Sequence, residues 1–555
     1  MTKIIKRGFK VAIFATLLSL PILAQQVKRT PFDVTNYVMD VALVPAERKL
    51  NATVDVTFTP LEDTRSVSFE LNGSLKIDTI TRLDKVLVMV PTAPVLPTAP
   101  KAAPKPAAQP TPNTVTFVQD QSNSSDLGPH VRVDLGDLVT KGTSVTLRFK
   151  YSGVLDTPAG GPLLSKRLAS VGENSGYLMY AARWFPFHDY AADPAMADIS
   201  ISLPAGFQLV GFSDAPVTNI GGKTRFVQST PALIGNFAYG KYAQKTLRIG
   251  DQELQFNTRP GSEAQVAAYG ETIGKALVDY TKRFGPADYG KKLIVVQIDD
   301  ESLDFYSSKG MLFVASRPFE EARDITYSRL QREAAYQWWG LTVGLKSFDE
   351  AWLSQGLAEY CAFSLRESET DGAKLDGLRR ELLEKSLTFE QTASLLRAPA
   401  NLDDQSSAYQ YIMYAKGAFV FKLLRETLGD QKFDQLLRTY LQQYRGKSAS
   451  IDDFEKLTTQ IAGQPMRYFF ARWVEGTGVP EFSSDYLIIR TKGGKFVTRG
   501  TVKQNYDNLR LPVEVQLRSE GDQGLQTVKL DMEEASADFN IESTGKPINV
   551  VIDPG

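Results

Sequence analysis

The sequence of 555 residues is poor in the side chains that build most metal and redox sites, with one cysteine and two histidines. A single cysteine excludes an intramolecular disulfide, and it excludes zinc sites built from four cysteines or from two cysteines and two histidines. The two histidines, His130 and His188, cannot form a site that needs three imidazoles. The lone thiol, Cys361, fits a buried and unreactive side chain better than a redox role.

An excess of charge and long apolar runs are also lacking. The formal net charge is −1, which argues against a general nucleic-acid binder. Beyond the first 24 residues no run reaches about 18 apolar residues, so we expect no membrane span in the mature chain. Apolar residues make up 43% of the chain, as in soluble globular proteins, and the length predicts several domains.

Residues 1–24 have the pattern of a secretory signal peptide. Basic side chains are frequent in the first ten residues, residues 11–23 are apolar, and Ala24 is a suitable cleavage residue. We therefore expect an exported protein, periplasmic or secreted. A retained membrane anchor is the alternative reading of the same segment.

The remaining chain predicts an α+β multidomain fold. Residues 25–250 show the two-residue alternation of β-strands, residues 251–482 are mainly helical in pattern, and residues 483–555 return to β. A Pro-rich segment, 91–113, interrupts the first block, and we interpret it as an exposed loop.

The helical block can be divided further. The periodicity predicts a helix over 262–284, a buried strand over 293–298, and a series of later helices, with a capping box at Ser450 and Asp453. The later helices are expected at 324–341, 352–366, 373–389, 405–428, 430–444 and 450–462.

Two short segments of the helical block carry a motif. The first is Arg332-Glu333-Ala334-Ala335-Tyr336-Gln337-Trp338-Trp339-Gly340, and the second is Trp352-Leu353-Ser354-Gln355-Gly356-Leu357-Ala358-Glu359-Tyr360. Together they resemble the M1 family of zinc aminopeptidases, which carries H-E-x-x-H-Q-W-x-G and W-L-N-E-G-x-A with the same spacing. Positions 332 and 336 correspond to the two histidines, and position 355 to the distal glutamate.

The resemblance extends over most of residues 32–482. Its further matches are Arg183-Trp184-Phe185-Pro186 with Asp189, then Tyr414-Ala415-Lys416-Gly417-Ala418, then Trp473, Gly476, Gly478 and Pro480. It implies an N-terminal β-sandwich-like domain, a thermolysin-like and mostly helical catalytic-type domain, and a C-terminal β-sandwich domain.

The resemblance also implies a zinc-dependent aminopeptidase reaction, but the family's three metal ligands are all replaced here. Arg332 and Tyr336 stand where the two histidines belong, and Gln355 stands where the glutamate belongs. A guanidinium has no lone pair to offer a metal, and tyrosine keeps its proton near neutral pH. We expect no metal ligands and no cofactor.

Other family positions are partly kept. Glu333 matches the general base and Tyr414 the tyrosine that stabilises the intermediate, so both are vestigial catalytic positions. The glutamate that binds the substrate's amino group becomes Ser307. For Glu333 we favour a structural ion pair with a neighbouring cation, Arg332 or Lys416, over the catalytic role.

We also expect the guanidinium of Arg332 to fill the former zinc position. There it would donate hydrogen bonds to Gln355 and to Glu333 or Glu359, because a buried cation needs such partners.

The sequence thus favours an exported M1 aminopeptidase-like protein that binds a peptide or protein without cutting it. One alternative is an active metallo-aminopeptidase with unusual ligands, which would need zinc. Another is a structural or assembly component of the cell envelope.

Overall fold

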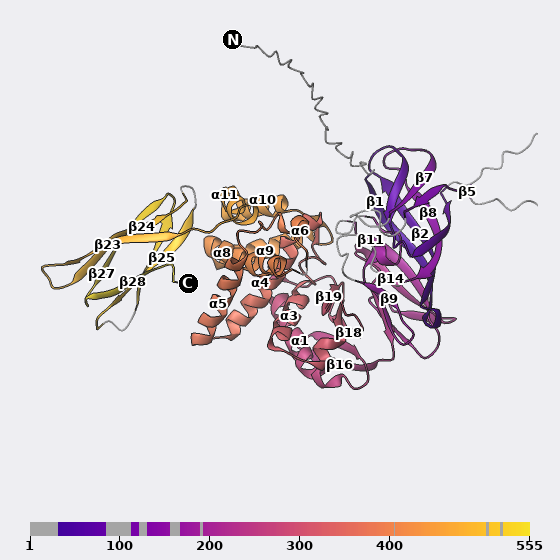
Figure 1. Cartoon of the computed structure of the whole chain (residues 1–555), viewed down its shortest axis with the longest axis horizontal. Coiled ribbons are helices and arrows are strands. Elements are labelled where there is room, and N and C mark those ends of the chain that lie inside the picture. The colour runs from indigo at the N-terminus through magenta and orange to yellow at the C-terminus, as the bar shows by residue number, and fades with distance from the viewer. Residues whose placement is uncertain are drawn as a thin grey trace, which may run out of the picture.

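The computed structural model describes residues 31–84, 113–120, 130–155, 167–188, 193–404, 406–506, 510–521 and 525–554. The predicted signal segment 1–24, the Pro-rich residues 91–112 and Asp189 lie outside these ranges. Three regions follow one another along the long axis: a β-rich N-terminal region, a mainly helical middle and a C-terminal pair of small sheets (Figure 1). This is the expected order of fold classes.

The N-terminal region is built on an eight-stranded sheet in the order β13-β14-β11-β1-β2-β8-β4-β5. Strands β1 and β2 alternate buried and exposed side chains, as a sheet with one wet face requires. The sheet comprises β1 (Phe32–Val44), β2 (Lys49–Pro60), β4 (Leu75–Arg82), β5 (Asn113–Thr114), β8 (Val145–Val154), β11 (Ala195–Ser202), β13 (Thr218–Ile220) and β14 (Lys223–Ala232).

Two smaller sheets complete this region. One consists of β3 (Thr64–Glu70), β7 (His130–Val139) and β6 (Phe117–Gln119), and the other of β12 (Gln208–Gly211), β15 (Phe237–Gly240), β10 (Gly176–Leu178) and β9 (Ala169–Val171). Both histidines of the chain lie in this region. His130 begins β7, and the Nδ1 atom of His188 lies 2.9 Å from a carboxylate oxygen of Asp193.

The middle region begins with a five-stranded sheet in the order β16-β17-β18-β20-β19. Its strands are β16 (Ala243–Ile249), β17 (Gln252–Thr258), β18 (Lys292–Ile298), β19 (Phe305–Ser308) and β20 (Met311–Ala315). Strand β16 pairs with β17, so this sheet already begins ahead of residue 251, where the sequence placed the boundary.

Both faces of β18 are covered, which explains the apolar run at 293–298, in which Gln297 is the single polar residue. In β18, Leu293 and Val295 join the core of the helical region, whereas Ile294 and Val296 join the core of the β-rich region. A strand buried on both sides carries no polar alternation. The sheet therefore ties the first two regions together.

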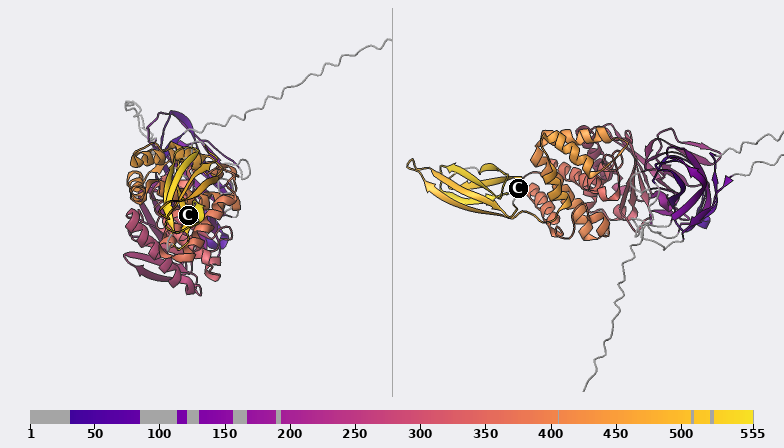
Figure 2. Two further views of the ribbon diagram at one scale, coloured as in Figure 1. Left: turned by 90° about the vertical axis from the view of Figure 1, so that its left-hand side faces the viewer. Right: turned by 90° about the horizontal axis from the view of Figure 1, so that it is seen from above.

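Helices make up the rest of the middle region (Figures 1 and 2). They are α1 (Val266–Phe284), α2 (Ser316–Glu320), α3 (Asp324–Ala335), α4 (Trp352–Glu369), α5 (Gly372–Thr388), α6 (Ala398–Asn401), α7 (Ser407–Gln410), α8 (Gly417–Leu428), α9 (Asp430–Tyr444), α10 (Ile451–Ala462) and α11 (Arg467–Phe470). A short parallel pair of strands, β21 (Gly344–Leu345) with β22 (Ser448–Ala449), connects the segment after α3 to the segment between α9 and α10. None of the helices among the described residues is both long enough and apolar enough to cross a membrane.

Two of the predicted helices end or break earlier than the periodicity indicated. The helix expected at 324–341 ends at Ala335, and the chain continues as turns to Gly340, which adopts a φ of +114°. The helix expected at 405–428 is divided into α7, a π-helical turn at Tyr411–Lys416, and α8. The apolar spacing of the sequence continues through both breaks, so periodicity alone did not reveal them.

The capping box predicted at the start of α10 is confirmed. The Ser450 hydroxyl accepts a hydrogen bond from the Asp453 backbone N–H at 3.2 Å, and the Asp453 carboxylate accepts one from the Ser450 N–H at 3.0 Å. These two bonds satisfy backbone donors that a helix start leaves unpaired.

The C-terminal region is a sandwich of two three-stranded sheets with its own small core. One sheet has the order β23-β24-β27 and the other β26-β25-β28. The strands are β23 (Phe482–Arg490), β24 (Phe496–Gln504), β25 (Leu511–Ser519), β26 (Gln526–Met532), β27 (Ser536–Ser543) and β28 (Pro547–Ile552). The alternating residues Val513, Val515 and Leu517 are all buried in it.

Candidate functional site

A cavity of about 570 Å³ opens where the helical region faces the β-rich region. Met179 and Leu233 of the β-rich region line one side, and residues of β19, α3, α4, α7 and the π-helical turn line the other. This cavity, here called the cleft, contains the motif positions that the sequence singled out: Ser307, Arg332, Glu333, Tyr336, Gln355 and Tyr414.

Helix α3 places the first motif at the floor of the cleft. Its apolar side, with Leu330, Ala334 and Ala335, is buried in the helical core. Because residues four apart lie on the same face of a helix, Arg332 and Tyr336 both reach the cleft. Trp338 and Trp339, which follow α3, are fully buried core residues.

Arg332 is held by three groups at once. Its Nη1 donates a hydrogen bond to Glu359 at 3.3 Å, its Nη2 lies 3.6 Å from Glu333, and its guanidinium lies 4.2 Å above the Tyr414 ring centre. Only 13% of the side chain is exposed. Burial by itself lowers the pKa of Arg332, but Tyr414 and Glu359 outweigh it, so the pKa is raised and the cation is fixed.

Glu333 is buried beside Ser307. The Ser307 hydroxyl donates to a Glu333 carboxylate oxygen at 2.8 Å and lies 3.1 Å from the Glu333 backbone carbonyl. Burial raises the pKa of Glu333, and the nearby Arg332 and the Ser307 hydrogen bond partly offset that rise. The carboxylate that matches the family's general base thus serves as a partner of Arg332 and Ser307.

Gln355, the third residue at a replaced position, accepts a hydrogen bond from a tyrosine. The Tyr409 hydroxyl donates to Gln355 Oε1 at 3.0 Å, and the hydroxyls of Tyr336 and Tyr414 are 3.5 Å apart. Burial raises the pKa of both Tyr336 and Tyr409, so their hydroxyls stay protonated. Near the buried cation the cleft therefore presents the neutral phenols of Tyr336 and Tyr409 and the amide of Gln355.

Close contact between two glycines brings Tyr414 to this site. A Cβ added at Gly417 would lie 2.9 Å from the Gly356 Cα, so the start of α8 packs directly against the start of α4. The turn that precedes Gly417 is π-helical rather than α-helical, and such turns occur frequently at functional sites.

These residues do not fit a zinc ion. Zinc binds thiolate, neutral imidazole or carboxylate ligands, and the three positions offer a guanidinium, a protonated phenol and an amide. Within the described ranges no three side chains of histidine, cysteine, aspartate and glutamate are grouped closely enough to hold a metal ion. We therefore derive no metal-dependent step at this site.

The structure refines the contacts expected from the sequence. Arg332 is buried and pairs with Glu359 and Glu333, as expected, but the partner of Gln355 is Tyr409, a residue that the motif did not indicate. Lys416 is not a partner of Glu333: it lies 3.0 Å from Glu390. Neither histidine lines the cleft.

Comparisons with known proteins identify the family of the domain that holds this site. The peptidase family M1 domain matches residues 297–473. The chain is 25% identical over 329 residues to glutamyl aminopeptidase of Rattus norvegicus, a match that covers 54% of this chain and 34% of the relative. It thus spans about a third of the length of that curated relative.

Solved structures show the same fold. The M1 zinc metallopeptidase of Deinococcus radiodurans superposes with a TM-score of 0.60 at 19% identity, covering 82% of this chain and 96% of the other. Aminopeptidase A of Legionella pneumophila superposes with a TM-score of 0.69 at 13% identity, covering 94% and 58%. This chain therefore carries a peptidase family M1 domain, at residues 297–473.

Proposed function

We propose that this protein is a non-catalytic M1 relative that binds peptides in the cleft without cutting them. The observation that carries the proposal is the position of Arg332, which is buried between Glu359 and Glu333 beneath the Tyr414 ring. A fixed cation occupies one of the positions from which the family's chemistry needs a metal ligand.

Electrostatics disfavours a metal next to this side chain. Two unit positive charges 4 Å apart repel by about 4 kcal/mol at an effective dielectric constant near 20, and a divalent ion doubles that figure. Without a metal there is no activated water, so Glu333 has no nucleophile to deprotonate.

The cleft itself suits a short peptide. Its volume of about 570 Å³ falls within the range of small-molecule sites. Phenol hydroxyls and the Gln355 amide can hydrogen-bond to peptide groups, while Phe187, Phe305 and Phe348 offer apolar contact. The two regions that form its walls would contact opposite sides of an extended chain.

Export is part of the same proposal. Residues 1–24 have the composition of a cleaved signal, and a periplasmic or secreted binding protein would meet peptides from outside the cell. We expect mass spectrometry of the protein from the envelope fraction to find an N-terminus at Gln25. A retained Met1 in that fraction contradicts cleavage.

Peptide binding is tested with a defined mixture of synthetic tri- to hexapeptides. The purified protein is incubated with the mixture, and bound peptides are identified by mass spectrometry. Gln355→Trp fills the cleft and should remove binding. Gln435→Trp makes the same change on the exposed face of α9 and should leave binding intact.

The proposal also requires that the bound peptides be recovered whole. Shortened peptides in the wild-type eluate would support the competing view, an active aminopeptidase. Equal recovery from wild type and Gln355→Trp would show that the cleft is not the binding site.

A further inference from the structure

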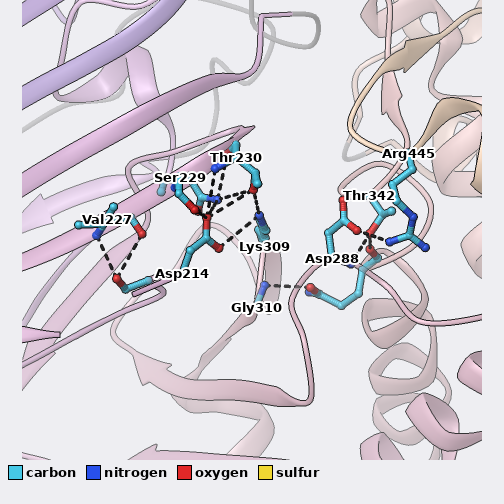
Figure 3. Close-up of polar contacts among 12 residues, drawn as sticks. Asp214, Val227, Ser229, Thr230, Asp288, Lys309, Gly310, Thr342 and Arg445 are labelled. Atoms are coloured by element: carbon cyan, nitrogen blue, oxygen red, sulfur yellow. Dashed lines mark hydrogen bonds and ion pairs between the residues drawn. The ribbon is translucent and has the colours of Figure 1, made fainter. Parts of the chain in front are cut away.

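A buried lysine lies in the turn between β19 and β20. Lys309 is 8% exposed, and its Nζ donates to the Thr230 hydroxyl at 2.9 Å and lies 3.5 Å from the Asp214 carboxylate. Both partners belong to the β-rich region, whereas Lys309 belongs to the sheet of the middle region (Figure 3). The ion pair therefore crosses from one region to the other.

Asp214 is held in place by several hydrogen bonds. Its Oδ2 accepts hydrogen bonds from the Gln228 side chain at 2.7 Å and from the Ser229 backbone N–H at 2.8 Å, while the hydroxyls of Ser229 and Thr230 lie within 3.4 Å of it (Figure 3). These donors fix the position of the Asp214 carboxylate, so the position of Lys309 is set by Asp214.

The rest of the turn is fixed from both sides. Gly310 has a φ of +68°, and an added Cβ would lie 2.1 Å from the Phe212 ring of the β-rich region. From the opposite side, Gln337 after α3 accepts from the Gly310 N–H at 2.9 Å and donates to the Ser308 carbonyl at 2.9 Å. The turn thus lies between the β-rich region and the end of the helix that carries Arg332 and Glu333.

The strand that leads into this turn ends at the floor of the cleft. Ser307 is two residues before Lys309, and its hydroxyl donates to Glu333 at 2.8 Å. We propose that Lys309 is a positioning residue: its ion pair with Asp214 sets the β19–β20 turn, and the turn sets the Ser307–Glu333 contact. The cleft floor is thereby coupled to the β-rich region, whatever the cleft binds.

The physical basis is the cost of an unpaired buried charge. When one partner of a buried pair is removed, the other must recover contact with water or find a new partner, and either requires movement. Movement of the Lys309 turn would shift β19, a short edge strand that, among the described strands, pairs only with β20. Ser307 would then leave Glu333.

A thiol placed at position 307 reports this contact. In Ser307→Cys the sulfur takes the place of the hydroxyl beside Glu333, and a neighbouring carboxylate raises a thiol pKa. Among the described residues, the other charged side chains that line the cleft are Asp304, Arg329, Arg332 and Asp404, and all of them stay in every variant. The native thiol gives little background, because Cys361 is fully buried and burial raises its pKa to about 12.

The measurement is the pH profile of iodoacetamide alkylation of the thiol introduced by Ser307→Cys, with the labelled site identified by peptide mapping. Adding Lys309→Met should shift the midpoint toward the ordinary thiol value of about 8.5 and speed alkylation at pH 8 about fivefold or more. Lys309→Arg keeps the charge and should stay within about twofold of Ser307→Cys alone. Asp214→Asn removes the pair from the other side and should act like Lys309→Met.

Lys416→Met is the matched control. Lys416 is also a buried lysine in an ion pair, 3.0 Å from Glu390, but among the described residues its hydrogen bond goes to that carboxylate and not to the β19–β20 turn. The change should destabilise the fold without moving the midpoint of the introduced thiol. The inference is overturned if Lys309→Met and Asp214→Asn leave the midpoint unchanged, or if Lys416→Met moves it equally. If Lys309→Met does not fold, Asp214→Asn decides the question alone.

Discussion

At Arg332 one guanidinium satisfies two carboxylates and covers the face of a tyrosine. The guanidinium is a positive charge attached to the chain, and it cannot act as a Lewis acid. Glu333 depends on the Arg332 cation, because burying its carboxylate beside Ser307 without a cation would cost folding free energy. At the residue scale the site is a buried cation between two carboxylates.

Restoring the family's ligands is the first prediction at this scale. Arg332→His, Tyr336→His and Gln355→Glu together remove the fixed cation and supply two imidazoles and a carboxylate at the family's spacing. We expect the triple variant to bind about one zinc per chain, measured by elemental analysis after dialysis. A folded triple variant without zinc would show that the cleft has changed beyond these three positions.

The second prediction at this scale concerns Glu333 and the pH dependence of the free energy of unfolding. Because burial raises the folded-state pKa of Glu333 above its unfolded value, the native state binds the extra proton between those two values. The contribution of Glu333 to the free energy of unfolding is therefore greatest below about pH 4 and declines as the pH rises through the folded-state pKa. Glu333→Gln removes this decline.

Urea unfolding at several pH values measures the effect. Relative to wild type, Glu333→Gln should gain stability as the pH rises from about 4 to 7. A difference between the two proteins that stays constant over this interval would mean that Glu333 has the same pKa in the folded and unfolded chains.

At the scale of elements, the site depends on how α3, α4 and the π-helical turn meet. The sequence predicted α4, α5, α9 and α10 within a few residues, and α9 and α10 each have a regular apolar stripe. It missed the π-helical turn at Tyr411–Lys416, which the apolar spacing does not mark, and the role of Tyr409, which follows from its tertiary contact with Gln355. Lys309 was missed for the same reason: its partner Asp214 is far away in the sequence.

The contact between Gly356 and Gly417 gives a prediction at this scale. Gly417→Ala should push α8 away from α4 and lower the free energy of unfolding by about 1–3 kcal/mol, the usual cost of overpacking. Gly377→Ala is the control, since it lies in exposed α5 with no atom within 4 Å of its added Cβ. That change should stabilise the protein by about 0.5–1 kcal/mol, because alanine favours helices. Equal effects of the two changes on the urea midpoint would contradict the close contact.

At the scale of the whole molecule, the first two regions share the five-stranded sheet, while the C-terminal sandwich has a separate core of eight buried apolar residues. The order of the three regions was predictable from strand and helix periodicity. Their junctions were not, because the shared sheet is seen only when the two faces of β18 are assigned to different cores.

The separate C-terminal core predicts independent unfolding. A small core supplies little stability of its own, so backbone amides of 496–504 should exchange with solvent at lower urea concentrations than those of β18. Hydrogen exchange followed by mass spectrometry measures both segments in one sample. Coincident loss of protection would show that the three regions unfold as one unit.

The central claim is that this M1 domain has no metal chemistry. Its most direct test is elemental analysis of the protein purified from zinc-supplemented medium, together with an assay of aminoacyl substrates before and after a chelator. The account predicts far less than one zinc per chain and no chelator-sensitive hydrolysis, with Arg332 in the former ligand position. One zinc per chain, with cleavage that the chelator abolishes and zinc restores, would contradict it.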